Sequence, residues 1–232
     1  MAQTLRRLAG LTFAAVLAAP ALAQSPGELG WCGNDAATTP ALQITDCTRV
    51  IQSGKAAPAN LILALIIRGR AYDAAGDQAS ALQDLDKAIA AEPKNAPALL
   101  LRGNVHGKRR EFDRAIADYD EALRLDPRLA TAVSDRGLAY AGMGNLDRAI
   151  ADYSEAIRLN SNVAMTFNNR GFLYFKKGDT RRAIADFEEA IRLDPKSALA
   201  FCNRGNAKLK IKETSGNADI AKARQLDASI CR

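Results

Sequence analysis

An arginine–glycine pair recurs five times at one constant spacing, and this period constrains the fold more than any other feature of the sequence. The five copies stand at 68–69, 102–103, 136–137, 170–171 and 204–205. A strict period of about 34 residues is typical of a helical solenoid, in which each repeat is one helix pair that buries its apolar face against its neighbours. The period therefore predicts an all-α solenoid, and it favours a binding surface over a reaction centre.

Several other positions recur in the same register. Each of the first four glycines is followed by an alanine, then by a large apolar residue, then by a second alanine. Small residues allow two antiparallel helices to approach closely, and the large apolar residues fill the space between repeats. Three repeats close with a proline, which ends the second helix. The recurring residues are Ala81, Leu85, Ala88 and Pro93; Ala115, Tyr119, Ala122 and Pro127; Ala149, Tyr153 and Ala156; Ala183, Phe187, Ala190 and Pro195.

This pattern resembles the tetratricopeptide repeat over residues 62–231. The resemblance implies a right-handed superhelix of antiparallel helix pairs, with a concave groove lined by the first helix of each pair. We expect the repeats at 62–95, 96–129, 130–163, 164–197 and 198–232, the last being a degenerate C-terminal cap. Residues 42–61 resemble the second helix of a repeat, with Cys47 in the position of Tyr153, and are expected to cap the N-terminal end. Residues 24–41 are expected to form a loop.

The arginine before each glycine departs from the apolar residue that is usual in this family. An aspartate recurs on the predicted second helix of four repeats, at Asp84, Asp118, Asp152 and Asp186. A charge that recurs in register usually belongs to the scaffold. We therefore expect the arginines and aspartates to pair as a ladder along the stack. The alternative is a row of free arginines that binds an anionic ligand.

Residues 1–23 have the features of a secretory signal. Arg6 and Arg7 precede an apolar run from Leu8 to Ala19, and Ala21-Leu22-Ala23 has the small-x-small form of a signal-peptidase site. We expect cleavage before Gln24 and export, most simply to a bacterial periplasm, with secretion to the medium as the alternative. No later apolar segment is long enough to span a membrane. Cleavage would remove two arginines and no acid, and so lower the net charge from +6 to +4.

All four cysteines follow the signal, and an oxidising compartment favours disulfides between them. The two ends of a solenoid lie several repeats apart, whereas a disulfide needs Cα atoms within about 7 Å. This geometry predicts the pairs Cys32–Cys47 and Cys202–Cys231. Metal binding by the cysteines is disfavoured, because no two of them have ligand spacing.

Little in the sequence supports catalysis or nucleic-acid binding. The single histidine, His106, occupies the position of Tyr72, Tyr140 and Tyr174, so we expect it to be a packing residue. No nucleophile has an evident base partner, and no phosphate-binding glycine loop is present. Acids alternate with bases along every repeat, without a continuous basic stripe. We expect no enzymatic activity, no cofactor, no metal and no nucleic-acid partner.

The groove that the resemblance implies would be apolar in its N-terminal part and polar in its C-terminal part. Asn169 and Asn203 occupy equivalent positions, with Asp135 one repeat before them. They resemble the start of the asparagine ladder in the superhelix of the O-linked N-acetylglucosamine transferase, where amides bind the backbone of an extended peptide. A solvated polar surface is the alternative. The predicted groove residues are Leu63, Ile66, Ile67, Leu100 and Leu101 in the apolar part, and Asp135, Asn168, Asn169, Asn203 and Asn206 in the polar part.

These features predict an exported scaffold that binds an extended segment of a protein partner of the cell envelope. One alternative is a structural adaptor that acts by self-association or through its convex face. Another is an accessory factor that recruits an envelope enzyme. The five apolar groove residues should not stay exposed on a monomer. We expect a partner peptide, a second copy of the chain, or residues 24–41 to cover them.

Overall fold

The computed structural model describes Cys32 and residues 39–231, and within these residues the chain forms eleven α-helices and no strand. The helix order confirms the predicted all-α class. The helices are α1 (Pro40–Gln52), α2 (Pro58–Ala74), α3 (Gln78–Ala91), α4 (Ala96–Lys108), α5 (Phe112–Leu125), α6 (Ala130–Gly142), α7 (Leu146–Leu159), α8 (Ala164–Lys176), α9 (Thr180–Leu193), α10 (Ala198–Lys210) and α11 (Gly216–Leu226).

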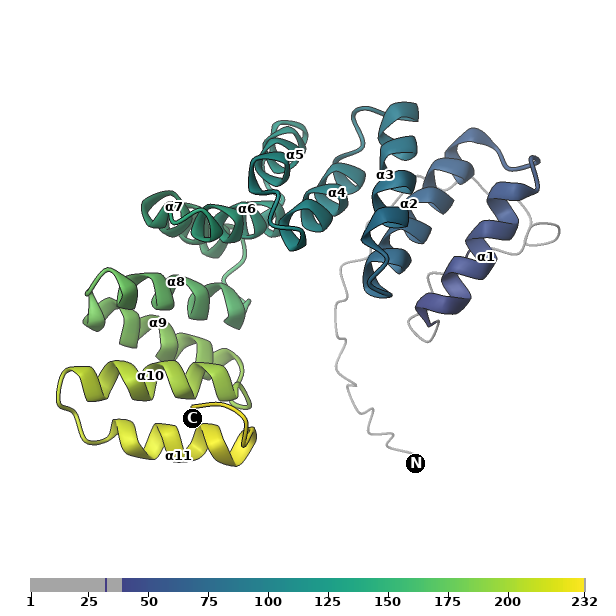
Figure 1. The fold of residues 1–232 in the computed structure, drawn as a ribbon. Coiled ribbons are helices and arrows are strands. Elements are labelled where there is room, and N and C mark those ends of the chain that lie inside the picture. The colour runs from purple at the N-terminus through teal and green to yellow at the C-terminus, as the bar shows by residue number, and fades with distance from the viewer. Residues whose placement is uncertain (1–31, 33–38, 232) are drawn as a thin grey trace, which may run out of the picture.

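The helices from α2 to α11 pack as five hairpins, and the second helix of each hairpin packs against the first helix of the next. First helices of neighbouring hairpins also contact one another, as α2 contacts α4, α4 contacts α6, and α8 contacts α10. The stack therefore bends toward its first helices. Figure 1 shows this curve, with α5 and α7 on its outer side and α4 and α6 on its inner side.

Two helices begin earlier than the sequence patterns indicated. Helix α1 begins at Pro40, inside the segment 24–41 that was expected to be a loop, and Thr39 caps it by accepting a hydrogen bond from the Leu42 amide. Helix α2 begins at Pro58, four residues before the expected repeat boundary. Both start at a proline, which is well tolerated in the first turn because that amide has no partner within the helix.

A tight turn joins the two helices of each repeat, and its backbone is the same whether or not the turn residue is a glycine. Gly76, Gly144 and Gly178 adopt φ values of 86°, 80° and 86° there. Arg110 and Lys212 occupy the same position in the second and fifth repeats, with φ values of 61° and 65°. The left-handed turn is thus kept in all five repeats, although a side chain in this conformation costs roughly 1–2 kcal/mol.

The recurring glycines lie where the two helices of a repeat touch. A Cβ atom placed on Gly137 would lie 3.1 Å from the Cβ atom of Asp152 and 3.3 Å from the Ala149 carbonyl oxygen. At Gly171 the equivalent backbone distance, to the Ala183 oxygen, is 3.1 Å. The alanines on the second helices are fully buried at these contacts. Close approach of the backbones therefore explains why glycine and alanine recur in register.

We expect Gly137→Leu to destabilise the middle of the array. A leucine side chain has no room between α6 and α7, and overpacking of this kind typically costs about 1–3 kcal/mol. Thermal unfolding followed by circular dichroism measures the loss. Gly144→Ala is an informative comparison, because nothing lies within 4 Å of a Cβ atom there and only the positive φ opposes the change. Equal melting temperatures for Gly137→Leu and the parent would contradict the helix contact.

The arginines and aspartates form the predicted ladder. In each of the five repeats the arginine Nε and Nη2 atoms donate to both carboxylate oxygens of one aspartate, at 2.6–2.9 Å. The fifth aspartate, Asp219, was not recognised in the sequence, because one residue is missing between it and Arg204 relative to the other repeats. The pairs are Arg68–Asp84, Arg102–Asp118, Arg136–Asp152, Arg170–Asp186 and Arg204–Asp219.

Four of these arginines also bind the preceding helix pair or half-repeat through Nη1. Arg102 reaches Asp86 at 2.8 Å, and Arg170 reaches the Ser154 hydroxyl at 3.1 Å. Arg68 reaches the Thr48 hydroxyl on α1 in the same way, at 2.8 Å. Helix α1 thus offers an acceptor to Arg68 as the second helices of later repeats do to the next arginines.

Both predicted disulfides are present. Cys32 and Cys47 are joined, with Cα atoms 4.7 Å apart, and Cys202 and Cys231 are joined, with Cα atoms 5.8 Å apart. Cys32 and Cys47 are buried beside Val50 and Ile67 at the N-terminal end of the stack. Each bridge thus lies at one end of the array, where a solenoid has a neighbour on one side only. The predicted signal at 1–23 lies outside the described residues.

Candidate functional site

The apolar residues predicted for the groove are mostly part of the core. Ile67 is only 6% exposed, and packs against Cys32 and Cys47. Ile66, Leu100 and Leu101 are partly buried and pack into three successive core clusters between repeats. Leu63 alone is exposed, at 38%. The prediction of an open apolar strip that needs a cover is therefore corrected: helices of neighbouring repeats, and Cys32 from residues 24–41, already cover most of it.

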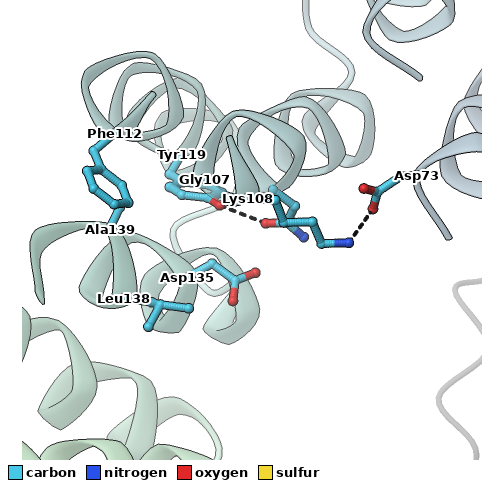
Figure 2. A pocket seen from close by; sticks show the side chains of 9 residues that line it. Asp73, Gly107, Lys108, Phe112, Tyr119, Asp135, Leu138 and Ala139 are labelled. Carbon is cyan, nitrogen blue, oxygen red and sulfur yellow. Dashed lines mark hydrogen bonds and ion pairs between the residues drawn. The ribbon is translucent and has the colours of Figure 1, made fainter. Parts of the chain in front are cut away.

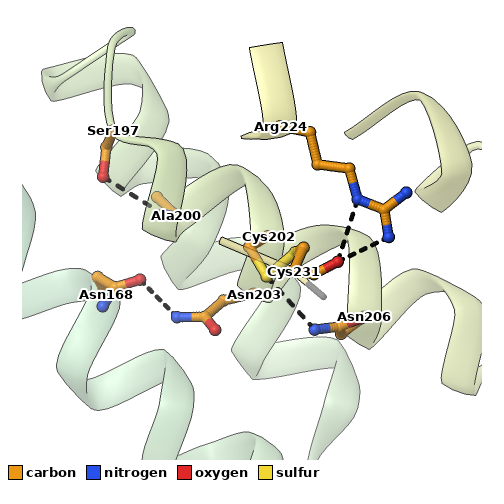
Figure 3. The surroundings of a disulfide bond; sticks show 8 residues. All are labelled: Asn168, Ser197, Ala200, Cys202, Asn203, Asn206, Arg224 and Cys231. Carbon is orange, nitrogen blue, oxygen red and sulfur yellow. Dashed lines mark hydrogen bonds between the residues drawn. A yellow bond between two sulfur atoms is a disulfide. The ribbon is translucent and has the colours of Figure 1, made fainter. Parts of the chain in front are cut away.

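The asparagines of the polar part lie together, but they bind one another or the core. Asn168 is buried, and its side-chain oxygen accepts a hydrogen bond of 2.9 Å from Asn203 Nδ2 on the next first helix. Asn169 hydrogen-bonds Tyr153, and Asn206 Nδ2 lies 3.6 Å from Cys202 Sγ. Figure 3 shows Asn168, Asn203 and Asn206 beside the Cys202–Cys231 bridge.

Most exposed apolar side chains of the first helices lie in α6, α8 and α10, a part of the array that the sequence patterns described as polar. Leu63 on α2, which is 38% exposed, is the exception and shares the repeat position of Met165 and Leu199. Leu138 and Phe172 occupy equivalent positions and are 57% and 40% exposed. Met165 and Leu199 occupy another shared position, seven residues before Phe172 and Asn206 and so on the same helix face. We call Leu138, Met165, Phe172 and Leu199 the inner apolar strip. Their recurrence in register with the repeat was the signal that could have identified them.

A pocket of about 290 Å³ adjoins the inner apolar strip where α2, α4, α5 and α6 meet. Leu138 lines the pocket and also belongs to the inner apolar strip. The strip therefore lies on the inner side of the array, where the first helices α2, α4 and α6 contact one another. The pocket carries two carboxylates and one ammonium group among apolar and aromatic side chains (Figure 2). Its lining residues are Asp73, Asn104, Gly107, Lys108, Phe112, Tyr119, Asp135, Leu138 and Ala139.

Asp135 is the electrostatically unusual residue of this pocket. Burial raises its pKa to about 6, and a hydrogen bond from the Asn104 amide opposes that rise. Within the described residues no cation pairs with the Asp135 carboxylate. Burial, with a contribution from the Asp135 charge, also raises the pKa of the Tyr119 hydroxyl. Asp135 is therefore a partly buried carboxylate with a raised pKa that lines a pocket, which makes it a candidate functional residue.

Asn104 links the groups in this pocket, although the sequence patterns did not single it out. With its amide oriented to satisfy its neighbours, Nδ2 donates to Asp135 Oδ2 at 3.0 Å and to the Tyr119 hydroxyl at 2.8 Å. Asn104 occupies the position of Leu138 and Phe172, so the same slot is polar in the second repeat and apolar in the next two. The change from amide to apolar side chain marks the boundary between the pocket and the strip.

Asp73 and Lys108 close the other side of the pocket. Lys108 Nζ donates to Asp73 Oδ2 at 2.7 Å, which joins the C-terminal turns of α2 and α4. The second oxygen, Asp73 Oδ1, is buried and has no hydrogen-bond partner in the part of the chain that the structure describes. Asp73, Lys108 and Asp135 together give the pocket one excess negative charge when Asp135 is ionised, since Tyr119 is neutral.

Other chemistry is scarce among the residues described. His106 is buried at the end of α4, where its Nδ1 lies 2.7 Å from Glu111 Oε2. Across Cys32 and residues 39–231, no three histidine, cysteine or acidic side chains are grouped as metal ligands. No helix in that part of the chain has the length and apolar character needed to cross a membrane.

Solved structures with the same fold are similar along most of their own length. The MamA crystal structure is 24% identical, with a TM-score of 0.63 over 69% of this chain and 95% of that chain. The structure of MamA residues 41–end from Desulfovibrio magneticus RS-1 is 17% identical, with a TM-score of 0.66 over 76% of this chain and 99% of that chain. YrrB, described as a TPR protein with an unusual peptide-binding site, is 20% identical. Its TM-score is 0.61 over 79% of this chain and 93% of that chain.

Sequence comparison agrees with the fold. None of the curated proteins compared matches the chain. The tetratricopeptide repeat matches it in three stretches, at residues 66–130, 103–164 and 164–197. Together these stretches extend without a gap over residues 66–197, more than half of the chain. The chain therefore belongs to the tetratricopeptide repeat family.

Proposed function

We propose that this protein is a non-enzymatic scaffold that binds an extended segment of a partner protein along the inner side of its array. The observation that carries the proposal is the inner apolar strip, which leaves four large apolar side chains in water on α6, α8 and α10. Clustered apolar exposure on a folded chain marks an interaction site. The peptide-binding site described for YrrB, which has the same fold, supports a similar use of this surface.

The dimensions of the array suit an extended peptide. First helices of neighbouring repeats pack about 8–10 Å apart, and an extended chain advances about 3.3 Å per residue. Each repeat would thus span about three residues of an extended partner segment, so that about every third side chain points at a new repeat. Asn169 and Asn203 remain candidates for hydrogen bonds to its backbone, because a carboxamide both donates and accepts.

Export is part of the proposal. The sequence of residues 1–23 supports it, with cleavage before Gln24 and delivery to a bacterial periplasm. The two disulfides support it as well, because disulfides persist in oxidising compartments and are rare in the cytosol. An envelope partner follows from the compartment.

Site-specific photo-crosslinking in exporting cells tests the proposal. A crosslinking amino acid in place of Phe172 should capture a partner protein, and one in place of Glu188, exposed on α9, should not. Both variants keep the buried residues of their helices, so they should fold alike. Capture from position 188 alone, or a crosslink only between two copies of the chain, would contradict groove binding and favour the adaptor function. Capture of an envelope enzyme from position 172 would identify the scaffold as an accessory factor.

A further inference from the structure

We propose that the pocket between α2, α4, α5 and α6 is a specificity subsite for one arginine side chain of the bound segment, with Asp135 as its counter-ion. This inference rests on the proposed function and names the partner chemistry at one end of the groove. The alternative cation, a lysine side chain, is distinguished by the experiment below.

Charge complementarity is the first support for a cationic occupant. The titratable and charged groups around Asp135 are Asp73 on α2, Lys108 on α4, Tyr119 on α5 and Tyr153 on α7. Among the described residues, Lys108 is the one cation that lines the pocket, and it is bound to Asp73 rather than to Asp135. A ligand with one positive charge would neutralise the excess negative charge of the pocket.

The hydrogen-bonding groups favour a guanidinium over an ammonium. Asp135 offers carboxylate oxygens, the Tyr119 hydroxyl can accept, and Asp73 Oδ1 has no donor among the described residues. A guanidinium carries five N–H donors in a planar fork and pairs well with carboxylates. Phe112, Leu138 and Ala139 line the apolar side of the cavity, where the aliphatic stem of an arginine would lie.

The position of the pocket determines what should flank the arginine. Leu138 borders the pocket and begins the inner apolar strip, which continues to Phe172 on α8. A segment with its arginine in the pocket would therefore place apolar residues over α6 and α8, about three residues away for each repeat. The subsite thus fixes the register of the segment along the groove.

Peptide selection tests both groove binding and the arginine subsite. The mature full chain is immobilised with both disulfides intact, and a library of random linear peptides is selected against it. We expect enriched peptides to share one arginine at a fixed distance from apolar residues. Enrichment of apolar peptides without a basic residue, or with lysine in place of arginine, would overturn the subsite while groove binding stands. Absence of any enriched peptide would overturn groove binding, and the subsite with it.

A double-mutant cycle then tests whether Asp135 is the group that pairs with the arginine of the peptide. Fluorescence polarisation measures the affinity of a selected peptide and of its citrulline analogue, which keeps the shape of arginine without its charge. The parent should bind the analogue about tenfold or more weakly, whereas Asp135→Asn should bind both peptides with similar, low affinity. Asp113→Asn, which removes an exposed charge on α5, is the matched control and should behave as the parent does. An equal loss on citrulline substitution in the parent and in Asp135→Asn would overturn the assignment.

Stability distinguishes loss of the subsite from loss of the fold. The folded-state pKa of Asp135 is raised from 3.8 to about 6, so its ionisation opposes folding as the pH rises through this range. Asp135→Asn should therefore melt at a higher temperature than the parent at pH 8, and at a similar temperature at pH 4. A variant that binds less while melting higher has lost the counter-ion and not the structure. Binding of the arginine peptide to the parent should also weaken below about pH 6, where Asp135 is protonated.

Discussion

Asp84→Ala is expected to lower the free energy of unfolding by about 3–5 kcal/mol, the range observed when one partner of a buried ion pair is removed. The Asp84 side chain is 2% exposed and the Arg68 side chain 12%. Without Asp84, the Arg68 guanidinium keeps the Thr48 hydroxyl as a partner but has no counter-ion in its pair. Chemical denaturation of the oxidised protein, followed by circular dichroism, measures the change.

Asp86→Ala is the matched control for this result. Asp86 lies on the same helix and also binds an arginine, Arg102, but its side chain is 59% exposed. Exposed ion pairs contribute about 0–1 kcal/mol because water and salt screen them. Similar losses for the two variants would mean that burial does not set the strength of the ladder.

The second large effect is expected at the C-terminal end. Replacing Cys202 and Cys231 together by serine should cost about 3–4 kcal/mol in the loop-entropy description, since the bridge closes a loop with a sequence separation of 29. The loss should appear first in α10 and α11, whose amide hydrogens should exchange faster while those of α4 to α7 stay protected. Hydrogen exchange detected by mass spectrometry resolves these segments.

Arg224→Ala distinguishes the contribution of the disulfide from that of the hydrogen bonds beside it. The Arg224 side chain donates two hydrogen bonds to the Cys231 carbonyl oxygen, at 3.1 and 2.7 Å, and lies beside the disulfide in Figure 3. This exposed contact should contribute about 1 kcal/mol or less. If Arg224→Ala destabilised α11 as much as the double serine variant, the hydrogen bonds rather than the disulfide would hold the C-terminal end.

The sequence predicts the scaffold well because the scaffold repeats. Gly137, Tyr153 and the arginine–aspartate pairs recur at a fixed spacing, and each recurrence independently supports the same helix register. The disulfides follow because a solenoid separates the two ends of the chain. Asp219 is the exception within the ladder, since the deletion of one residue moves it out of the common spacing while leaving the contact with Arg204 intact.

The candidate site is harder to predict because it depends on exposure rather than on residue type. Ile67 and Leu138 are both apolar residues of first helices, yet Ile67 is 6% exposed and Leu138 is 57% exposed. Their places within the repeat are three positions apart, which turns the side chain by about 60° around the helix axis, enough to separate the packed side from the inner surface. The pocket is harder still, since Asp73, Lys108 and Asp135 come from three repeats and share no repeated position.

The Nη1 hydrogen bonds of the arginines all run in one direction along the stack, from one repeat to the repeat or half-repeat before it. Four of the five arginines, from Arg68 to Arg170, donate backward to an acceptor on the helix pair or half-repeat that precedes them. The acceptors are Thr48, Asp86, Asp120 and Ser154. A carboxylate and a hydroxyl both serve, so the joint between neighbours tolerates sequence change as long as one oxygen is present. Whole repeats can therefore be gained or lost by duplication or deletion of one full period without a new interface. The length of the groove, and with it the length of the segment it holds, can change in evolution in steps of one helix pair.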